Sequence, residues 1–159
     1  MTTAIPLPLT FKLPDGWQPV PPKQVGMAAN TFVAVHPASA NGFTANITVA
    51  EQDRSDDATL PQLADESVQR LESVTTNVTI QNRTEVGSQE APGLTQILRL
   101  SADGMSLIQC QFFMSLVDEH NADRHVVVEL TLTATNDQFP DLVGDFQTFV
   151  SSVRLDTGE

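Results

Sequence analysis

The chain is poor in cysteine and in basic residues. Cys110 is its one cysteine, and 8 Lys and Arg residues stand against 20 Asp and Glu, for a formal net charge of −12. A single cysteine cannot form a disulfide within the chain. Nucleic-acid binding normally starts from a basic patch, so we expect no nucleic-acid partner. The acidic excess also disfavours binding to anionic membrane surfaces.

Long hydrophobic runs are missing as well. No window approaches the ~18 uninterrupted apolar residues of a membrane span, so none is predicted. The N-terminal stretch MTTAIPLPLTFKLP has no basic region, and prolines interrupt its apolar residues, unlike a signal peptide or a lipoprotein signal. From the chain as given we expect a cytoplasmic protein, or an envelope protein if a leader has been lost upstream.

The chain does contain enough apolar residues for one folded domain. It has 159 residues, of which 40% are hydrophobic. A chain of that length can bury roughly 70% of its unfolded surface, so it needs no disulfide staples. Because no repeat or linker is visible, we predict a single domain over residues 1–159. Residues 1–6 and the tail 156–159 are expected to be flexible.

Alternation of apolar and polar residues predicts the strands. In the clearest case, FTANITVAE at 43–51, one set of side chains is apolar and the other polar, which is typical of a half-buried strand. The proline-rich stretch 17–30 is expected to be a long loop. Further strands are predicted at residues 7–13, 32–35, 78–86, 94–101, 105–117 and 126–135.

Two amphipathic helices complete the pattern. The first has capping-box spacing at Thr59 and Gln62 and ends near Thr75. The second covers about 139–155 and is capped by Asn136 or Asp137. The order βββαββββα predicts an α+β domain, with a single antiparallel sheet of about seven strands and both helices on its apolar face.

The hairpin near Gly104 tests this one-sided arrangement. A two-residue turn at Asp103-Gly104 would place Leu98 opposite Gln109 and mix the apolar and polar faces. A three-residue loop, Ala102 to Gly104, keeps the faces separate, so we predict that loop.

Several segments resemble a known superfamily: FKLPDGW at 11–17, FVAVHP at 32–37, FTANITVAE at 43–51, and the C-terminal helix. They are similar to the PsbP-like superfamily, which joins PsbP of photosystem II to a Ran-binding nuclear-transport protein. They resemble the actinobacterial LpqN/LpqT lipoprotein-like group more closely. The resemblance implies a PsbP-like fold and an accessory or adaptor role, in some members linked to secretion systems. It offers no catalytic residues, and mid-strand Cys110 cannot serve as a lipidated cysteine.

No pattern of catalytic or metal-binding residues stands out. Cys110 falls on an apolar strand face, where a thiol behaves as a small hydrophobe, and no GxSxG motif occurs. His120, His125 and Asp118 could supply metal ligands, but they lack a recognised ligand spacing and suit an ordinary turn. We therefore expect no catalytic residues, no cofactor, no metal and no enzymatic activity.

The candidate partner surface is the polar face of the predicted sheet. Its uncharged side chains suit a protein contact, where charge is depleted, although a solvated sheet face shows the same pattern. The residues of this surface are Thr44, Asn46, Thr48, Gln109, Gln111, Phe113, Val127, Thr131 and Thr133.

These observations predict a non-enzymatic accessory or adaptor protein that acts through a protein partner of unknown identity, with a homodimer as a further prediction. The alternative is a small-molecule or lipid-binding domain with an apolar pocket between sheet and helices, near Phe112, Met114 and Phe146.

Overall fold

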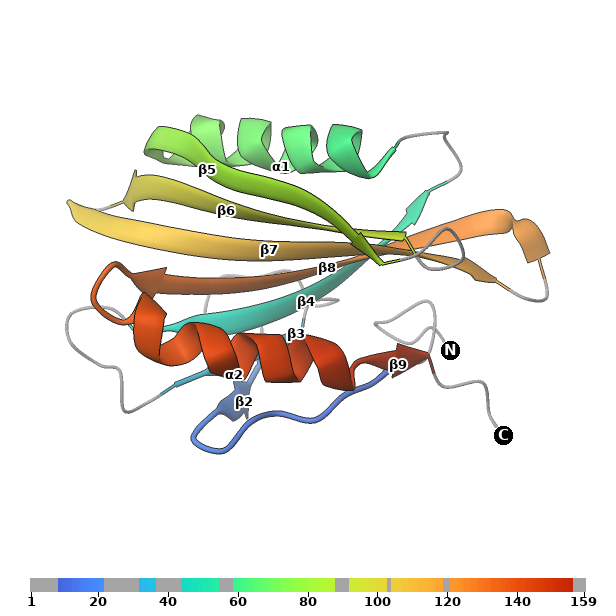
Figure 1. Cartoon of the computed structure of the whole chain (residues 1–159), viewed down its shortest axis with the longest axis horizontal. Helices are drawn as coiled ribbons and strands as arrows, with labels where there is room; N and C mark the ends of the chain where they lie inside the picture. Colours follow the sequence, from blue (N-terminus) through green and yellow to red (C-terminus); the bar gives the residue numbers. More distant parts are fainter. Residues whose placement is uncertain are drawn as a thin grey trace.

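The computed structural model describes residues 9–21, 32–36, 44–54, 59–87, 92–102, 104–118 and 121–155. Its centre is a seven-stranded antiparallel sheet, shown in Figure 1. In spatial order the strands are β2 (Gln18–Val20), β3 (Phe32–Val35), β4 (Asn46–Arg54), β8 (Asn121–Thr135), β7 (Met105–Asp118), β6 (Pro92–Ala102) and β5 (Thr76–Gly87). The termini predicted to be flexible lie outside the described residues.

Two helices pack on this sheet, α1 (Leu60–Val74) and α2 (Phe139–Ser152). A separate two-stranded sheet pairs β1 (Leu9–Thr10) with β9 (Arg154–Leu155). The predicted α+β class, the antiparallel sheet of about seven strands and the two helices are confirmed.

The two helices lie on opposite faces of the sheet, which corrects the predicted one-sided arrangement (Figure 1). Leu63 of α1 belongs to a buried cluster with Phe113 and Val127. Phe146 of α2 belongs to another cluster, which holds the opposite-facing residues of the same two strands, among them Cys110 and Leu130. Successive side chains of a strand point to opposite faces, so the sheet buries apolar residues on both.

The β6–β7 hairpin follows from this two-sided burial. Ala102 pairs with Met105, which leaves a two-residue turn, and Leu98 lies opposite Gln109. The predicted three-residue loop is therefore wrong. That prediction assumed that one face of the sheet is apolar and the other polar. Leu98 lies on the face that α1 covers, so this face also buries apolar residues. Gly104 has φ +78°, a left-handed conformation that suits glycine in such a turn.

The first predicted strand does not join the main sheet. Within the described part of that segment, residues 9–13, the strand is Leu9–Thr10, and it pairs with β9. The apolar alternation there instead reflects packing, because the ring of Phe11 makes edge contacts with Phe32 and Phe149. The seventh strand of the sheet is β2, which we had expected to be loop. Pro19 is tolerated there because β2 is an edge strand.

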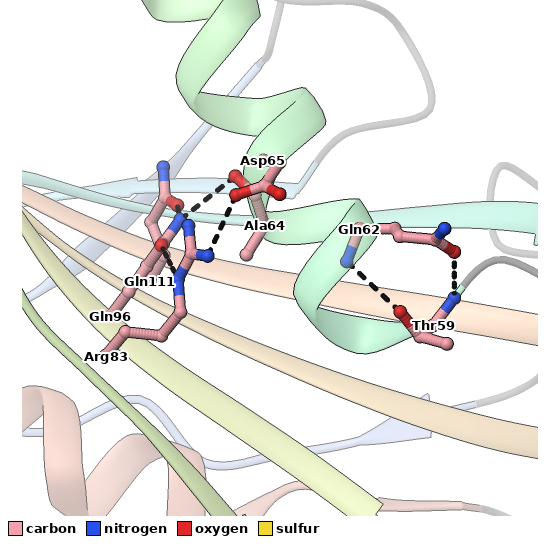
Figure 2. A network of polar contacts seen from close by, with 7 residues as sticks. All are labelled: Thr59, Gln62, Ala64, Asp65, Arg83, Gln96 and Gln111. Carbon is pink, nitrogen blue, oxygen red and sulfur yellow. Dashed lines mark hydrogen bonds and ion pairs between the residues drawn. The ribbon is translucent and has the colours of Figure 1, made fainter.

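The helix ends were predicted with mixed success. The capping box of α1 is confirmed: the Gln62 backbone N–H donates to Thr59 Oγ1, and the Thr59 N–H donates to Gln62 Oε1 at 2.8 Å (Figure 2). The N-cap of α2 is Gln138, not Asn136 or Asp137, and Thr135 and Gln138 exchange two hydrogen bonds there. This helix also ends earlier than predicted, at Ser152.

Trp17 anchors the segment before β2 to the second helix. Its side chain is buried, and its indole Nε1 donates to Asp145 Oδ2 of α2 over 3.0 Å. The ring also lies 5.0 Å from that of His36. A tryptophan with a buried ring and a paired N–H acts as a packing residue.

Candidate functional site

The structure buries much of the predicted partner surface. Gln111 and Phe113 are only 1% exposed, and Val127, Thr131 and Thr133 are also buried. The part of the surface that these five residues were to form is therefore not accessible, because α1 covers Phe113 and Val127.

The remaining members of that surface keep some exposure. Thr44 is exposed, while Asn46, Thr48 and Gln109 are partly buried. Their contact with a partner stays a prediction.

What lies under α1 is a chain of polar side chains that crosses four strands. Arg83 Nε donates to Gln96 Oε1 over 2.9 Å, and Gln96 Nε2 donates to Gln111 Oε1 over 2.7 Å (Figure 2). Gln111 Nε2 then donates to Gln109 Oε1, and Gln109 Nε2 donates to Thr133 Oγ1. Buried amides need such partners, so the glutamines of this face satisfy one another inside the protein.

The same chain is tied to the helix. Gln96 Nε2 also donates to the backbone carbonyl of Ala64, and Arg83 Nη1 forms an ion pair with Asp65 Oδ1 at 2.8 Å (Figure 2). These contacts hold α1 against β5 and β6 and give the glutamines a structural role.

Glu129 is the titratable group of the α1 side with a shifted pKa. It accepts a hydrogen bond from Arg70 Nη2 over 3.3 Å. Burial raises the pKa of Glu129, and the Arg70 guanidinium partly opposes that shift. A half-exposed arginine on α1 faces this carboxylate, which is ordinary structural pairing.

Cys110 is the nucleophile that the sequence draws attention to, and the structure makes it unreactive. Burial raises the pKa of its thiol to about 11, and a hydrogen bond with Thr95 lowers it only in part. Because the thiolate is the reactive form, little of it exists near neutral pH.

No metal-binding group of three or more His, Cys, Asp or Glu occurs among the residues that the structure describes. His120 lies outside those residues. Neither α1 nor α2 has the length and apolar character that crossing a bilayer requires.

The accessible surface of interest lies on the other side of β5, β6 and β7. There α1 contacts these three strands from behind, whereas α2 contacts β8 and β7 from the front (Figure 1). Among the described elements, neither helix lies over the front of β5 and β6 (Figure 1). We call this surface the open face. The strand pairing places on it Thr79, Asn82, Thr84, Val86, Thr95, Ile97, Arg99, Ser101, Ser106, Phe112 and Met114. Gly93, Ile108 and Cys110 point to the same face but are buried.

The open face has an apolar centre and a polar rim without acidic residues. Ile97, Phe112 and Met114 are partly buried and pack against the α2 cluster, while Thr84 and Arg99 are exposed. The surface contains no Asp or Glu, although the whole chain has 20. Its one charged residue is Arg99, whose Nε donates to Gln81 Oε1 at 2.8 Å.

One side of α2 is also free of acidic residues. Asp145 bonds Trp17 near β2, so the opposite side of the helix faces β7. Helical spacing places Val143, Gln147 and Val150 on that side. It places Asp141 on the other side, together with Asp145. The open face and the adjoining helix flank therefore form one continuous surface without carboxylates.

Sequence reasoning missed the open face because it depends on which face each helix covers. A usable signal was present in the leucines of 94–100: Leu94, Leu98 and Leu100 share one parity and Ile97 has the other. That pattern indicates a strand with apolar residues on both faces.

The seven-stranded antiparallel sheet and the element order βββαββββα agree with the expected PsbP-like fold. Three solved proteins that share it are distant in sequence. No protein-family model matches the chain, and no curated protein matches it.

Solved structures show the likeness. LpqN, involved in cell envelope biogenesis of Mycobacterium tuberculosis, aligns with a TM-score of 0.72 at 12% identity, over 95% of this chain and 86% of LpqN. Cyanobacterial PsbP (CyanoP) from Synechocystis aligns with a TM-score of 0.61 at 17% identity, over 93% and 86%. The Ran-binding protein Mog1p of Saccharomyces cerevisiae aligns with a TM-score of 0.57 at 13% identity, over 92% and 89%.

These likenesses confirm the PsbP-like fold and the similarity to LpqN that the sequence suggested. At such identities they establish the fold alone.

Proposed function

We propose that this protein is a non-enzymatic accessory or adaptor protein that binds another protein through the open face. The observation that carries the proposal is the composition of that surface. Interface cores are depleted in charged residues and enriched in aromatic residues and methionine. Phe112 and Met114 lie at the centre of the open face, and carboxylates are absent from it.

The shared fold supports this class of function. Mog1p is a Ran-binding protein, and LpqN is involved in cell envelope biogenesis. The finer form of the proposal is a role at a bacterial envelope or in a secretion system. The raised pKa of Cys110, which keeps the thiol protonated, supports a non-catalytic role.

Site-specific photo-crosslinking tests the proposal. A photoreactive amino acid replaces Thr84 or Arg99 on the open face, and in the control proteins it replaces Thr148 or Ser151 on the outer side of α2. All four side chains are at least partly exposed, so the fold should tolerate each change. We expect one protein from the source cells to cross-link to the open-face positions and not to Thr148 or Ser151.

The cross-linked protein is then produced on its own and its affinity measured. Arg99→Glu introduces a carboxylate onto the open face and should weaken binding at least about tenfold, as charge reversal at an interface does. Glu72→Lys on the outer side of α1 is the control. Equal binding by both variants, or cross-linking that is identical at all four positions, would refute this surface.

Binding of a small apolar molecule is the second candidate function. Phe112 and Met114 are only partly buried at the margin of the cluster that contains Phe146, so an apolar ligand could extend that cluster. Native mass spectrometry of the purified protein tests it, and a mass equal to that of the chain alone would contradict it.

A further inference from the structure

The two edges of the sheet differ in how well they are protected. At one edge, β2 is three residues long and contains Pro19, with Pro21 just beyond it. Proline lacks a backbone N–H and discourages another strand from pairing there. At the other edge, β5 is twelve residues long and has no proline and no lysine. Among the described residues, no strand pairs with its outer side.

Part of this free edge is regular. Its pairing with β6 is irregular between Thr76 and Asn82, where bulges bend the strand. From Asn82 to Gly87 every residue has its own partner on β6. Alternate residues of an antiparallel strand direct N–H and C=O to the same side, so half of this stretch presents unpaired backbone groups outward. The stretch holds one positive and one negative side chain, Arg83 and Glu85, and is therefore neutral in a chain of net charge −12.

We propose that two copies of this chain dimerise by antiparallel pairing of their β5 edges, centred on Thr84. A two-fold axis perpendicular to the sheet places equivalent faces of the two copies on the same side, so pairing must be centred on a residue. Centring on Arg83 sets that arginine against its own copy, and centring on Glu85 sets two carboxylates together. Centring on Thr84 sets Arg83 against Glu85 of the second copy, twice by symmetry.

The two charged side chains lie on the same face of each monomer. Arg83 and Glu85 pair with Gln96 and Leu94, so both point to the α1 side. Arg83 is held in place by Asp65 and Gln96, whereas Glu85 is exposed. Cross-strand pairs of opposite charge stabilise such a pairing and like charges oppose it. The dimer would join the open faces of both copies into one surface without carboxylates.

Hydrophobic side chains are also exposed near this edge. Val74, at the end of α1 just before β5, is 77% exposed, and Ile80 of β5 is 43% exposed. They are the large hydrophobic residues that the described part of the chain leaves most open to solvent. A second copy that pairs with β5 would place its own surface near these two side chains.

Disulfide trapping tests the register directly. Thr84→Cys places a thiol on the two-fold axis, within the Cα separation that a disulfide requires. Asn82→Cys is the matched control, since Asn82 is also exposed on the open face but lies opposite Val86 of the second copy. Under mild oxidation we expect a covalent dimer from Thr84→Cys and little from Asn82→Cys. Buried Cys110 should not interfere. Equal cross-linking by both variants would overturn the register.

Charge reversal tests the pairing without a covalent bond. Glu85→Arg sets two arginines opposite each other in both symmetric pairs, and it should raise the dimer dissociation constant at least about tenfold. Glu72→Arg makes the same charge change on the exposed side of α1 and should leave the constant nearly unchanged. Sedimentation velocity over a range of concentrations measures both, and urea unfolding confirms that each variant is folded.

A rescue variant completes the test. Adding Asp65→Arg and Arg83→Glu to Glu85→Arg preserves the pair between positions 65 and 83 and restores opposite charges across the axis, so dimerisation should return. A wild-type chain that stays monomeric at every concentration would overturn the proposal. A chain that stays monomeric while an added foreign peptide pairs with its β5 edge would overturn the proposal as well. None of these measurements uses the open-face partner, so the dimer and the proposed function fail separately.

Discussion

Gln96 and Gln111 form a buried hydrogen bond between neighbouring strands, with Nε2 of Gln96 donating to Oε1 of Gln111 over 2.7 Å. Both faces of these strands carry apolar residues, so the hydrophobic pattern alone opposes a one-residue slip only weakly. A slip of β6 against β7 would separate the two amides and leave each without its partner inside the protein. We infer that this pair fixes the register of the sheet.

The first prediction concerns this pair. Gln96→Leu leaves Gln111 Oε1, the Ala64 carbonyl and Arg83 Nε without their partner. Unpaired buried polar groups cost about 1 to 3 kcal/mol each, so with three groups affected we expect the free energy of unfolding to fall by at least about 3 kcal/mol. Urea denaturation measures it.

The control for that experiment is Gln81→Leu. Gln81 also accepts a hydrogen bond from an arginine, Arg99, but on the exposed side of the sheet. Its loss should change the free energy of unfolding by at most about 0.5 kcal/mol. Equal losses of unfolding free energy in both variants would mean that the buried Gln96–Gln111 pair stabilises the protein no more than an exposed hydrogen bond does.

The sequence predicted the elements well and their arrangement less well. Local patterns identify a strand or a helix, and the Thr59 and Gln62 capping box was recognised in this way. A helix stripe shows only that one side is buried, not which face of the sheet buries it, so α1 was placed on the wrong face. Phe113 was consequently expected to be exposed. Two short strands, β2 and β9, were hidden by Pro19 and by the end of a helical stripe.

The second prediction concerns the start of α1. Thr59→Ala removes the hydroxyl that accepts the Gln62 N–H, so the free energy of unfolding should fall by about 1 kcal/mol. Thr59→Ser keeps an acceptor and should retain most of the stability. Thermal unfolding followed by circular dichroism compares the three proteins, and a serine variant as unstable as the alanine variant would contradict the cap.

The third prediction concerns thiol reactivity. Because burial raises the pKa of Cys110 to about 11, the native protein should react with iodoacetamide far more slowly than a small thiol does at pH 8. Denaturant should restore rapid labelling. Mass spectrometry of timed samples measures the rate. Fast labelling of the folded protein would show that the thiol is more accessible than the structure indicates.

The fourth prediction is a pH dependence from Glu129. Burial raises its pKa above the ordinary value of 4.5, so the folded state binds this proton more tightly than the unfolded state. The stabilising contribution is therefore complete below pH 4.5 and is lost as the pH rises through the raised pKa. Glu129→Gln, which cannot ionise, should gain stability relative to the wild type over that interval.

Arg70 determines the pH range over which the contribution of Glu129 to stability is lost. It favours the charged form of Glu129, so Arg70→Met should raise the pKa further and move the loss of stability to higher pH. Urea unfolding at a series of pH values follows all three proteins. A stability difference between wild type and Glu129→Gln that does not change with pH would contradict the assignment.

The last prediction tests burial on both sides of the sheet. Phe113 faces α1 and Leu130 faces α2, and both are almost completely buried. Phe113→Ala should lower the free energy of unfolding by about 3 to 5 kcal/mol and Leu130→Ala by about 2 to 5 kcal/mol. In a sheet with one solvated face, one of the two losses would be small. Thr84→Ala, on the open face, should cost at most about 0.5 kcal/mol. A small effect at Phe113 would indicate that the α1 side of the sheet is exposed to solvent. Phe113 would then be accessible again as the central residue of the predicted partner surface.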